Sequence, residues 1–291
     1  MHLNFKCIVP IGNEDIYMKK ERYTVLMSVY YKEKPAYLET SIESMLNQTI
    51  PPDEFVIVKD GPLSKELDAV IDTFIDKNPG LFTIIENKVN LGLGPALAKG
   101  ILASRNSLIA RMDSDDYSVN TRCEKQLKEF EKDSALEMVG TFEAEFIDNI
   151  ENVISIHSVP ETDSEIRKFM RRRCAVLHPT VMYKKQSVID SGNYQDVHLY
   201  EDYDLFARMV LEHNSKTYNI QENLYYIRTS EDFFKRRGGI KYAQTVLKFK
   251  LGQYKNGYMS LKDFILSGFG QAMVCLMPNS MRKWFYMTFL R

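Results

Sequence analysis

The chain has 291 residues, 44% of them hydrophobic and 26% charged, which is typical of a soluble globular protein with a sizeable core. Its four cysteines lie far apart, which argues against a disulfide framework or a cysteine-based zinc site. The net charge of −1 hides an asymmetry, because residues 235–291 hold eleven lysines and arginines but a single acid, Asp263. This basic segment also carries Trp284, Tyr286 and Phe289, so it fits an anionic membrane surface better than a nucleic acid.

Residues 23–134 alternate between short apolar runs and amphipathic stretches. The apolar runs at 24–30, 55–58, 81–85 and 107–110 have the length of strands, and the stretches between them have helical spacing. This alternation predicts a parallel sheet covered by helices on both faces. Polar groups follow three of the strands, and the ends of parallel strands meet at one edge of a sheet. The sequence therefore predicts one pocket formed by residues 30–32, 60–61 and 113–115.

The pattern changes after residue 134. Strands are expected at 137–141, 153–156, 181–183 and 224–227, a charged helix over about 163–173, and an amphipathic helix that opens at 200–204. From about residue 235 the chain is expected to be mainly helical, with a break at Pro278.

Neither a signal peptide nor a membrane-spanning helix is expected. Lys6, Glu14 and Asp15 interrupt the N-terminal segment, so it has no apolar core of the signal-peptide kind. The longest uncharged stretch, 264–281, contains two glycines and a proline, and a spanning helix needs about 20 predominantly apolar residues. We interpret this stretch as interfacial or as part of the core. A reducing cytoplasm is the simplest setting for the separate cysteines.

Three carboxylates follow the strand at 107–110 within four residues. Asp113, Asp115 and Asp116 would repel one another and would be costly to bury, and a divalent cation bound through oxygen would relieve both effects. Asp113 and Asp115 are two positions apart, so they face the same way on an extended segment. The pattern predicts a site for a metal and a diphosphate.

Two other interpretations of these carboxylates are open. A calcium loop between two helices would use Asp113, Asp115 and Glu124, although its fifth position is a tyrosine and its sixth a serine instead of glycine. Alternatively, Asp116 or Asn120 caps a helix over about 121–132, which would leave the other carboxylates unexplained.

Several segments together carry a family resemblance. They are VLMSVY at 25–30, SIESMLNQT at 41–49, VKDG at 58–61, NLGLG at 90–94, ARMDSDD at 110–116 and EDY at 201–203. In this order they resemble the family 2 glycosyltransferases, which are inverting enzymes with the GT-A fold, over residues 23 to about 230. The chain is most similar to bacterial exopolysaccharide, capsule and O-antigen transferases of the amylovoran-biosynthesis type. It departs at Ala98, where many members have asparagine.

The resemblance implies a nucleotide-sugar donor, a UDP-sugar, and Mn²⁺ or Mg²⁺. Asp115 is expected to bind the metal, with Asp113 contacting the metal through water or touching the donor ribose. Asp60 is expected to accept a hydrogen bond from the uracil, and Arg111 either contacts a donor phosphate or pairs with the aspartates. The other donor-binding residues implied are Val29, Tyr30, Asn90, Gly92 and Ser114.

An inverting transfer is a single displacement, and it requires a base that takes the proton of the acceptor hydroxyl. The resemblance assigns this role to Asp202. The alternative is that Glu201 and Asp202 are simply acids favoured at the start of a helix. His178 is either a third metal ligand or a packed loop residue.

The resemblance also implies an overall function and domain organisation. It implies transfer of a hexose or N-acetylhexosamine, from a donor of the UDP-galactose or UDP-glucose type, to a lipid-linked saccharide through a β-linkage. The product would belong to a bacterial polysaccharide, capsule or O-antigen. We expect an N-terminal extension (1–22), a GT-A domain (23–234) and a basic, mainly helical region (235–291). Residues 23–134 would bind the nucleotide-sugar and residues 135–234 the acceptor.

The expected location is the cytoplasmic face of the inner membrane, held peripherally by the C-terminal region, and no nucleic acid partner is expected. Two other classes of function are open. A sugar-1-phosphate nucleotidyltransferase would need a glycine-rich, basic loop after the first strand, where this chain has YYKE. A non-catalytic sugar-binding module should lack one of the metal or base carboxylates, and none is missing. The sequence carries no signal for an oligomeric state.

Overall fold

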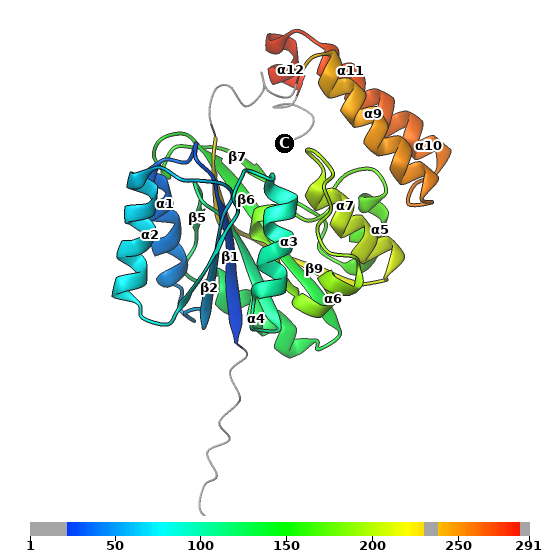
Figure 1. Ribbon diagram of the computed structural model, residues 1–291. Coiled ribbons are helices and arrows are strands. Elements are labelled where there is room, and N and C mark those ends of the chain that lie inside the picture. The colour runs from blue at the N-terminus through cyan, green and yellow to red at the C-terminus, as the bar shows by residue number, and fades with distance from the viewer. Residues whose placement is uncertain (1–21, 230–237, 286–291) are drawn as a thin grey trace, which may run out of the picture.

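The computed structural model describes residues 22–229 and 238–285. Almost all of the predicted N-terminal extension lies outside this part of the chain, and so do Tyr286 and Phe289. Within it, a mixed nine-stranded sheet is flanked by helices, and a group of C-terminal helices stands at one corner (Figure 1). The strand order is β3-β2-β1-β4-β8-β6-β9-β5, with β7 paired to β6 outside this path.

The first four strands are parallel, as predicted, and helices connect them. Leu26 and Val56 point into a core on the α3 side of the sheet, while Val25 and Phe55 point into a second core against α1 and α2. Burial on both faces explains why these strands read as continuous apolar runs. The elements are β1 (Tyr23–Val29), α1 (Pro35–Leu46), β2 (Glu54–Lys59), α2 (Lys65–Lys77), β3 (Phe82–Glu86), α3 (Leu93–Ala103) and β4 (Leu108–Asp113).

The second half of the sheet mixes directions. Strand β8 is antiparallel to both β4 and β6, whereas β6 is parallel to β9. The elements are β5 (Tyr117–Ser118), α4 (Arg122–Lys132), β6 (Leu136–Phe146), β7 (Val153–His157), α5 (Asp163–Met170), η1 (His178–Thr180), β8 (Met182–Lys184), α6 (Lys185–Asp190), α7 (Glu201–Ala207), η2 (Arg208–Glu212) and β9 (Lys216–Arg228).

Three predicted boundaries in this half were wrong. Strand β6 continues to Phe146 instead of ending at residue 141. Strand β9 begins at Lys216 instead of residue 224. The polar residue Asn219 can lie within the buried part of this strand because its side-chain amide donates hydrogen bonds to the carbonyls of Pro160 and Ala175. Helix α5 ends at Met170 instead of residue 173. The chain turns there, and the Arg172 guanidinium pairs with Asp263, 2.5 Å away, in the C-terminal region.

The C-terminal region is helical, as predicted, and breaks at Pro278. Its elements are α9 (Ile240–Lys255), α10 (Leu261–Asp263), η3 (Phe264–Phe269), α11 (Gly270–Leu276) and α12 (Asn279–Phe285). Elements α10, η3 and α11 follow one another without a gap and lie beside α9 (Figure 1). Val246 and Phe249 of α9 belong to the same core as Tyr200 and Tyr203 of α7. Across both described ranges, we find no helix with the length and apolar character needed to cross a bilayer.

Candidate active site

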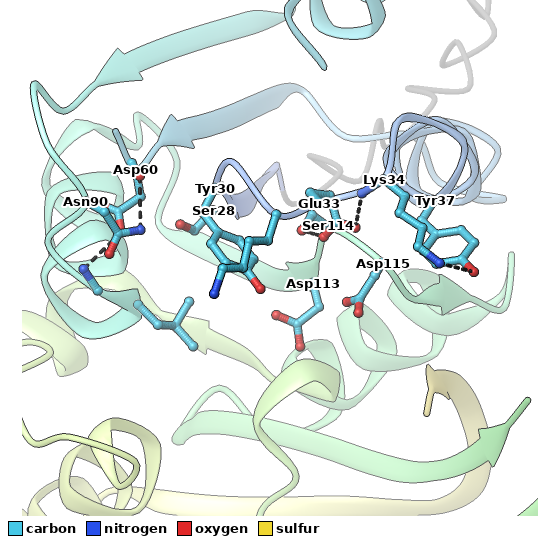
Figure 2. Close-up of a pocket in the computed structure, with 13 residues that line it drawn as sticks. Ser28, Tyr30, Glu33, Lys34, Tyr37, Asp60, Asn90, Asp113, Ser114 and Asp115 are labelled. Atoms are coloured by element: carbon cyan, nitrogen blue, oxygen red, sulfur yellow. Dashed lines mark hydrogen bonds between the residues drawn. The ribbon is translucent and has the colours of Figure 1, made fainter. Parts of the chain in front are cut away.

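A cavity of about 450 Å³ opens at the carboxyl ends of β1, β2 and β4. The structure thus brings together the three strand ends that the sequence predicted to meet (Figure 2). The lining residues are Ser28, Tyr30, Lys32, Glu33, Lys34, Tyr37, Asp60, Asn90, Gly92, Leu93, Asp113, Ser114 and Asp115. Four of the predicted site residues are not among them: Val29, Arg111, His178 and Asp202.

Arg111 lies beneath the cavity and holds Asp113. Its two terminal nitrogens each lie 2.5 Å from one carboxylate oxygen of Asp113, in a bidentate pair. Burial alone would lower the pKa of Arg111, but the Asp113 carboxylate raises it above its usual value. Arg111 is only 2% exposed and does not line the cavity, so the structure favours pairing with an aspartate over contact with a donor phosphate.

Asp115 lies in an environment that disfavours its charged form. Burial, followed by the charges of Asp113 and Glu33, raises its pKa to about 7. Ser114 donates a hydrogen bond to Glu33, which holds that carboxylate near the aspartates (Figure 2). Three acidic side chains therefore converge on one rim of the cavity, where a bound cation would be stabilised.

The third aspartate, Asp116, has a structural role. Its carboxylate accepts hydrogen bonds from the Tyr225 hydroxyl at 3.1 Å and the Arg228 backbone N–H at 2.8 Å. Burial raises its pKa well above the usual value. The capping interpretation was wrong, because Thr121 occupies the N-cap of α4 without a side-chain cap. Glu124 binds Thr49 and Lys128 away from the cavity, which leaves the calcium-loop interpretation without support.

Asp60 organises the glycine-rich turn that follows β3. Its carboxylate accepts hydrogen bonds from the backbone N–H groups of Leu91 and Gly92 and from the Asn87 amide, each at 2.9 Å. Asn90 donates to the Asp60 carbonyl at 3.2 Å. Gly61, which follows Asp60, has a φ of +92°, and a Cβ at this position would lie 2.8 Å from the Asn90 nitrogen. Asp60 therefore shapes the wall of the cavity as well as facing it.

The two predicted base-pocket residues differ in exposure. Tyr30 is 42% exposed and lines the cavity, with its ring 5.9 Å from that of Tyr31. Val29 is fully buried in the core against α1 and α2. Of these two residues, only Tyr30 can therefore touch a ligand through its side chain.

His178 lies in the core. Its Nε2 is 2.8 Å from the Tyr194 hydroxyl, and its ring packs against Phe206. Burial, with a smaller contribution from Arg111, lowers its pKa far below the usual value, so the imidazole is neutral. The structure does not bring His178 to the cavity with Asp113 and Asp115, and its metal-ligand role stays a prediction.

Within the described residues, no group of three or more histidine, cysteine, aspartate or glutamate side chains is arranged to bind a metal by itself. Magnesium, however, is commonly bound by one or two carboxylates together with waters and substrate phosphates. Asp113 and Asp115 offer such a carboxylate pair beside an open cavity. This set of oxygen donors fits Mg²⁺ or Mn²⁺ shared with a diphosphate.

Asp202 lies on the first turn of α7, where its carboxylate accepts a hydrogen bond from the Tyr203 N–H at 2.7 Å. Burial and then the Asp202 charge raise the pKa of neighbouring Glu201, while Arg111 is close enough to lower it in part. Gly94 of α3 makes this approach possible, because a Cβ there would lie 2.7 Å from the Gln195 carbonyl and 3.2 Å from the Glu201 Cβ. The start of α7 therefore packs directly against the first turn of α3.

Sequence reasoning missed Glu33 and Arg228. Glu33 could have been found, since it follows the first strand at the edge where the pocket was predicted. Arg228 could not, because its partners are distant in sequence. Its guanidinium lies 3.9 Å from the ring centre of Tyr37 and 4.6 Å from that of Phe146, and its Nε donates to the Asp115 carbonyl at 2.9 Å. Arg228 therefore fixes the backbone of the acidic segment.

The fold and the acidic cavity define a class, the nucleotide-sugar transferases of the GT-A type. Two solved structures share the fold: a mannosyltransferase of Pyrobaculum calidifontis in complex with GDP-Man and Mn²⁺, and Staphylococcus aureus TarS in complex with UDP-GlcNAc. Their TM-scores are 0.62 and 0.58 at 13% and 15% identity, over 91% and 92% of this chain and 72% and 71% of theirs. The model of glycosyl transferase family 2 matches residues 24–192, and the chain belongs to that family.

Curated relatives match over nearly the whole chain. A UDP-Gal:α-D-GlcNAc-diphosphoundecaprenol β-1,3-galactosyltransferase of Escherichia coli is 34% identical over 93% of this chain and 97% of its own length. The amylovoran biosynthesis glycosyltransferase AmsE of Erwinia amylovora is 32% identical over 91% of this chain and 97% of its own length. The predicted family and fold are therefore confirmed.

Proposed function

We propose that this family 2 glycosyltransferase transfers a hexose or N-acetylhexosamine from a UDP-sugar to a lipid-linked saccharide, with inversion, to form a β-linkage in bacterial polysaccharide, capsule or O-antigen synthesis. The observation that carries the proposal is the cavity in which Asp60, from the end of β2, meets Asp113 and Asp115, from the end of β4. The name of the E. coli relative favours UDP-galactose as donor and a sugar-diphospholipid as acceptor, with a donor of the UDP-glucose type next.

Asp115 and Asp113 would hold Mg²⁺ or Mn²⁺, which supplies positive charge to stabilise a diphosphate leaving group. The chain's own residues prepare this site. Arg111 fixes both oxygens of Asp113, and Arg228 fixes the backbone of Asp115. On the rim, Tyr30 and the turn organised by Asp60 would hold the nucleoside.

Asp202 acts on the acceptor. It takes the proton of the attacking hydroxyl while that oxygen forms a bond to the anomeric carbon and the bond to the UDP oxygen breaks. A single displacement of this kind requires no covalent intermediate on the enzyme. Support for this role comes from the position of Asp202 on α7, against the donor half but outside the lining of the donor cavity.

The direct test is a panel of UDP-sugars with a synthetic lipid-diphosphate-N-acetylglucosamine acceptor and Mn²⁺ or Mg²⁺. We expect a disaccharide-lipid product and free UDP. Formation of a nucleotide-sugar from UTP and a sugar 1-phosphate would instead support the nucleotidyltransferase alternative. Ligand binding without any product would support a sugar-binding module.

Asp60→Ala is expected to weaken donor binding. The variant leaves two N–H groups of the glycine-rich turn without their carboxylate partner. Hydrogen bonds to a charged group contribute about 1.5–3 kcal/mol, so the KM for the donor should rise roughly 10- to 100-fold. Steady-state kinetics with a saturating acceptor measures this change. Asp53→Ala, which removes an exposed carboxylate outside the cavity, is the control, and an equal KM for both variants would contradict the assignment.

Lys250→Met is expected to lower kcat without changing UDP affinity. Lys250 of α9 donates to the Arg172 carbonyl at 2.6 Å and to the Tyr203 hydroxyl of α7 at 3.4 Å. Tyr203 directly follows Asp202 in the sequence. Burial lowers its pKa to about 8. Losing a charged hydrogen bond of about 1.5–3 kcal/mol should loosen the start of α7 and reduce kcat roughly tenfold or more.

The matched control for this experiment is Lys248→Met, which removes an exposed lysine two positions away on the same helix. Calorimetry measures the affinity for UDP independently of turnover. A Lys250→Met enzyme with normal kcat, or with lost UDP affinity, would show that α9 does not support the acceptor side.

We further propose that the enzyme works peripherally at the cytoplasmic face of the inner membrane, through its C-terminal region. The basic composition of residues 235–291 and the lipid-linked substrate in the name of the E. coli relative support this location. Cell fractionation with a salt wash tests it, since a peripheral protein is released by salt.

A further inference from the structure

Most of the exposed large hydrophobic side chains within the described ranges belong to the C-terminal helices. The continuous helix formed by α10, η3 and α11 carries six of them, each about half exposed or more. We name this set the apolar stripe: Leu261, Ile265, Leu266, Phe269, Met273 and Leu276. Soluble proteins rarely expose large contiguous apolar patches without a binding role.

The stripe occupies one face of this helix. Apart from the adjacent pair Ile265 and Leu266, successive members are three or four residues apart, which places the set on a single side. The opposite side packs on α9 through small residues, among them Gly268, Ala272 and Cys275, all of them buried. Helix α9 and the helix packed on it form a hairpin. The other side of α9 attaches this hairpin to the rest of the protein, and there the Phe249 ring stacks on the Tyr200 ring with 4.1 Å between the ring centres. The apolar stripe is therefore an outer surface of a well-packed unit.

The exposed charged side chains of α9 and of the helix with the stripe are all positive. Lys241, Lys248 and Lys255 are exposed on α9, and Lys262 is exposed on α10. The one acid in residues 238–285, Asp263, is 9% exposed and pairs with Arg172. A surface that combines apolar side chains with lysines suits the headgroup layer of an anionic membrane. Two copies of this chain would instead bring like charges together.

We propose that the apolar stripe and its flanking lysines form a docking surface for an anionic lipid bilayer, a proposal that rests on the lipid-linked acceptor inferred above. The helix lies in the plane of the interface with the stripe buried among the headgroups and the upper acyl chains. The contact thus lies mainly on α10–α11, within the basic region 235–291 that the sequence predicted to meet a membrane. In α12, Arg282 is 3% exposed and donates to the Cys275 carbonyl at 2.9 Å, so this cation holds α12 in place.

The test is co-sedimentation of the full-length protein with vesicles of phosphatidylglycerol and phosphatidylcholine, or of phosphatidylcholine alone. We expect the wild type to bind the anionic vesicles at least tenfold more tightly. The variant L266D/M273D should lose that binding at least tenfold, while its turnover with a short-chain, water-soluble acceptor stays at the wild-type level. L102D is the matched control, since Leu102 is 62% exposed on α3, outside the C-terminal helices, and it should bind vesicles normally.

Undiminished vesicle binding by L266D/M273D would overturn the proposal. So would a wild-type dimer, seen by analytical ultracentrifugation, that dissociates in this variant without any lipid, because the stripe would then cover a second copy of the chain. If no protein, including the wild type, transfers sugar to the soluble acceptor, the proposed function fails, while the vesicle result still decides the docking surface.

Discussion

Asp115→Asn is expected to abolish glycosyl transfer while the protein stays folded. The amide keeps the size of the side chain but removes the charge that would hold a divalent cation. Loss of that cation is worth several kcal/mol of transition-state stabilisation, so kcat should fall roughly a thousandfold. Chelation of the wild-type enzyme with EDTA should produce the same loss, reversed by Mn²⁺ or Mg²⁺. Glu124→Gln, a carboxylate-to-amide change away from the cavity, should be fully active.

The same substitution should stabilise the metal-free protein at neutral and higher pH. Burial, Asp113 and Glu33 raise the pKa of Asp115 from 3.8 to about 7. The folded state therefore favours the protonated form, and the stability contributed by this group is lost as the pH rises through 7. Thermal unfolding in metal-free buffer should give Asp115→Asn a higher Tm than the wild type at pH 8, with the difference shrinking toward pH 4. Activity that survives EDTA, or a Tm difference independent of pH, would contradict this scheme.

Asp202→Asn should reduce kcat by roughly 100- to 10,000-fold, which is the range that a general base contributes. UDP affinity should remain near the wild-type value, because this carboxylate is proposed to act on the acceptor and does not line the cavity proposed for the donor. Calorimetry with UDP and single-turnover transfer from a saturating donor separate the two effects. Glu201→Gln alters the adjacent acid on the same turn and should be much less damaging. If the Asp202 variant loses UDP binding but still transfers sugar, the base lies elsewhere.

The part of the site that follows from local pattern could be predicted from the sequence. Buried parallel strands give continuous apolar runs, so the meeting of Asp60, Asp113 and Tyr30 at one edge follows from strand order and direction. The roles of neighbouring aspartates could not be separated in the same way. Asp116 looks like Asp115 in sequence, and only the Tyr225 hydroxyl and the Arg228 N–H make it structural.

Contacts between segments that are distant along the chain also could not be predicted from the sequence. Arg228 braces the acidic segment through partners from α1, β6 and the end of β4, and no spacing rule connects these positions. The C-terminal aromatic residues likewise gave no sign of which would be buried. Phe249 packs into the core of the catalytic domain, whereas Phe269 of the same region is 51% exposed.

The two-sided packing of α9 has a geometric consequence. One side of this helix contacts Tyr200 and Tyr203, which flank Asp202, and the other side carries the helix with the apolar stripe. When the stripe rests on lipid, α9 and the helix with the stripe lie between Asp202 and the bilayer, so their combined thickness sets the height of Asp202. At a fixed height, Asp202 would reach a sugar that lies close to the diphosphate of the lipid. It would not reach the far end of a long saccharide on the same lipid. Acceptors with one, two and four sugars on the same lipid should then be glycosylated at steeply decreasing rates.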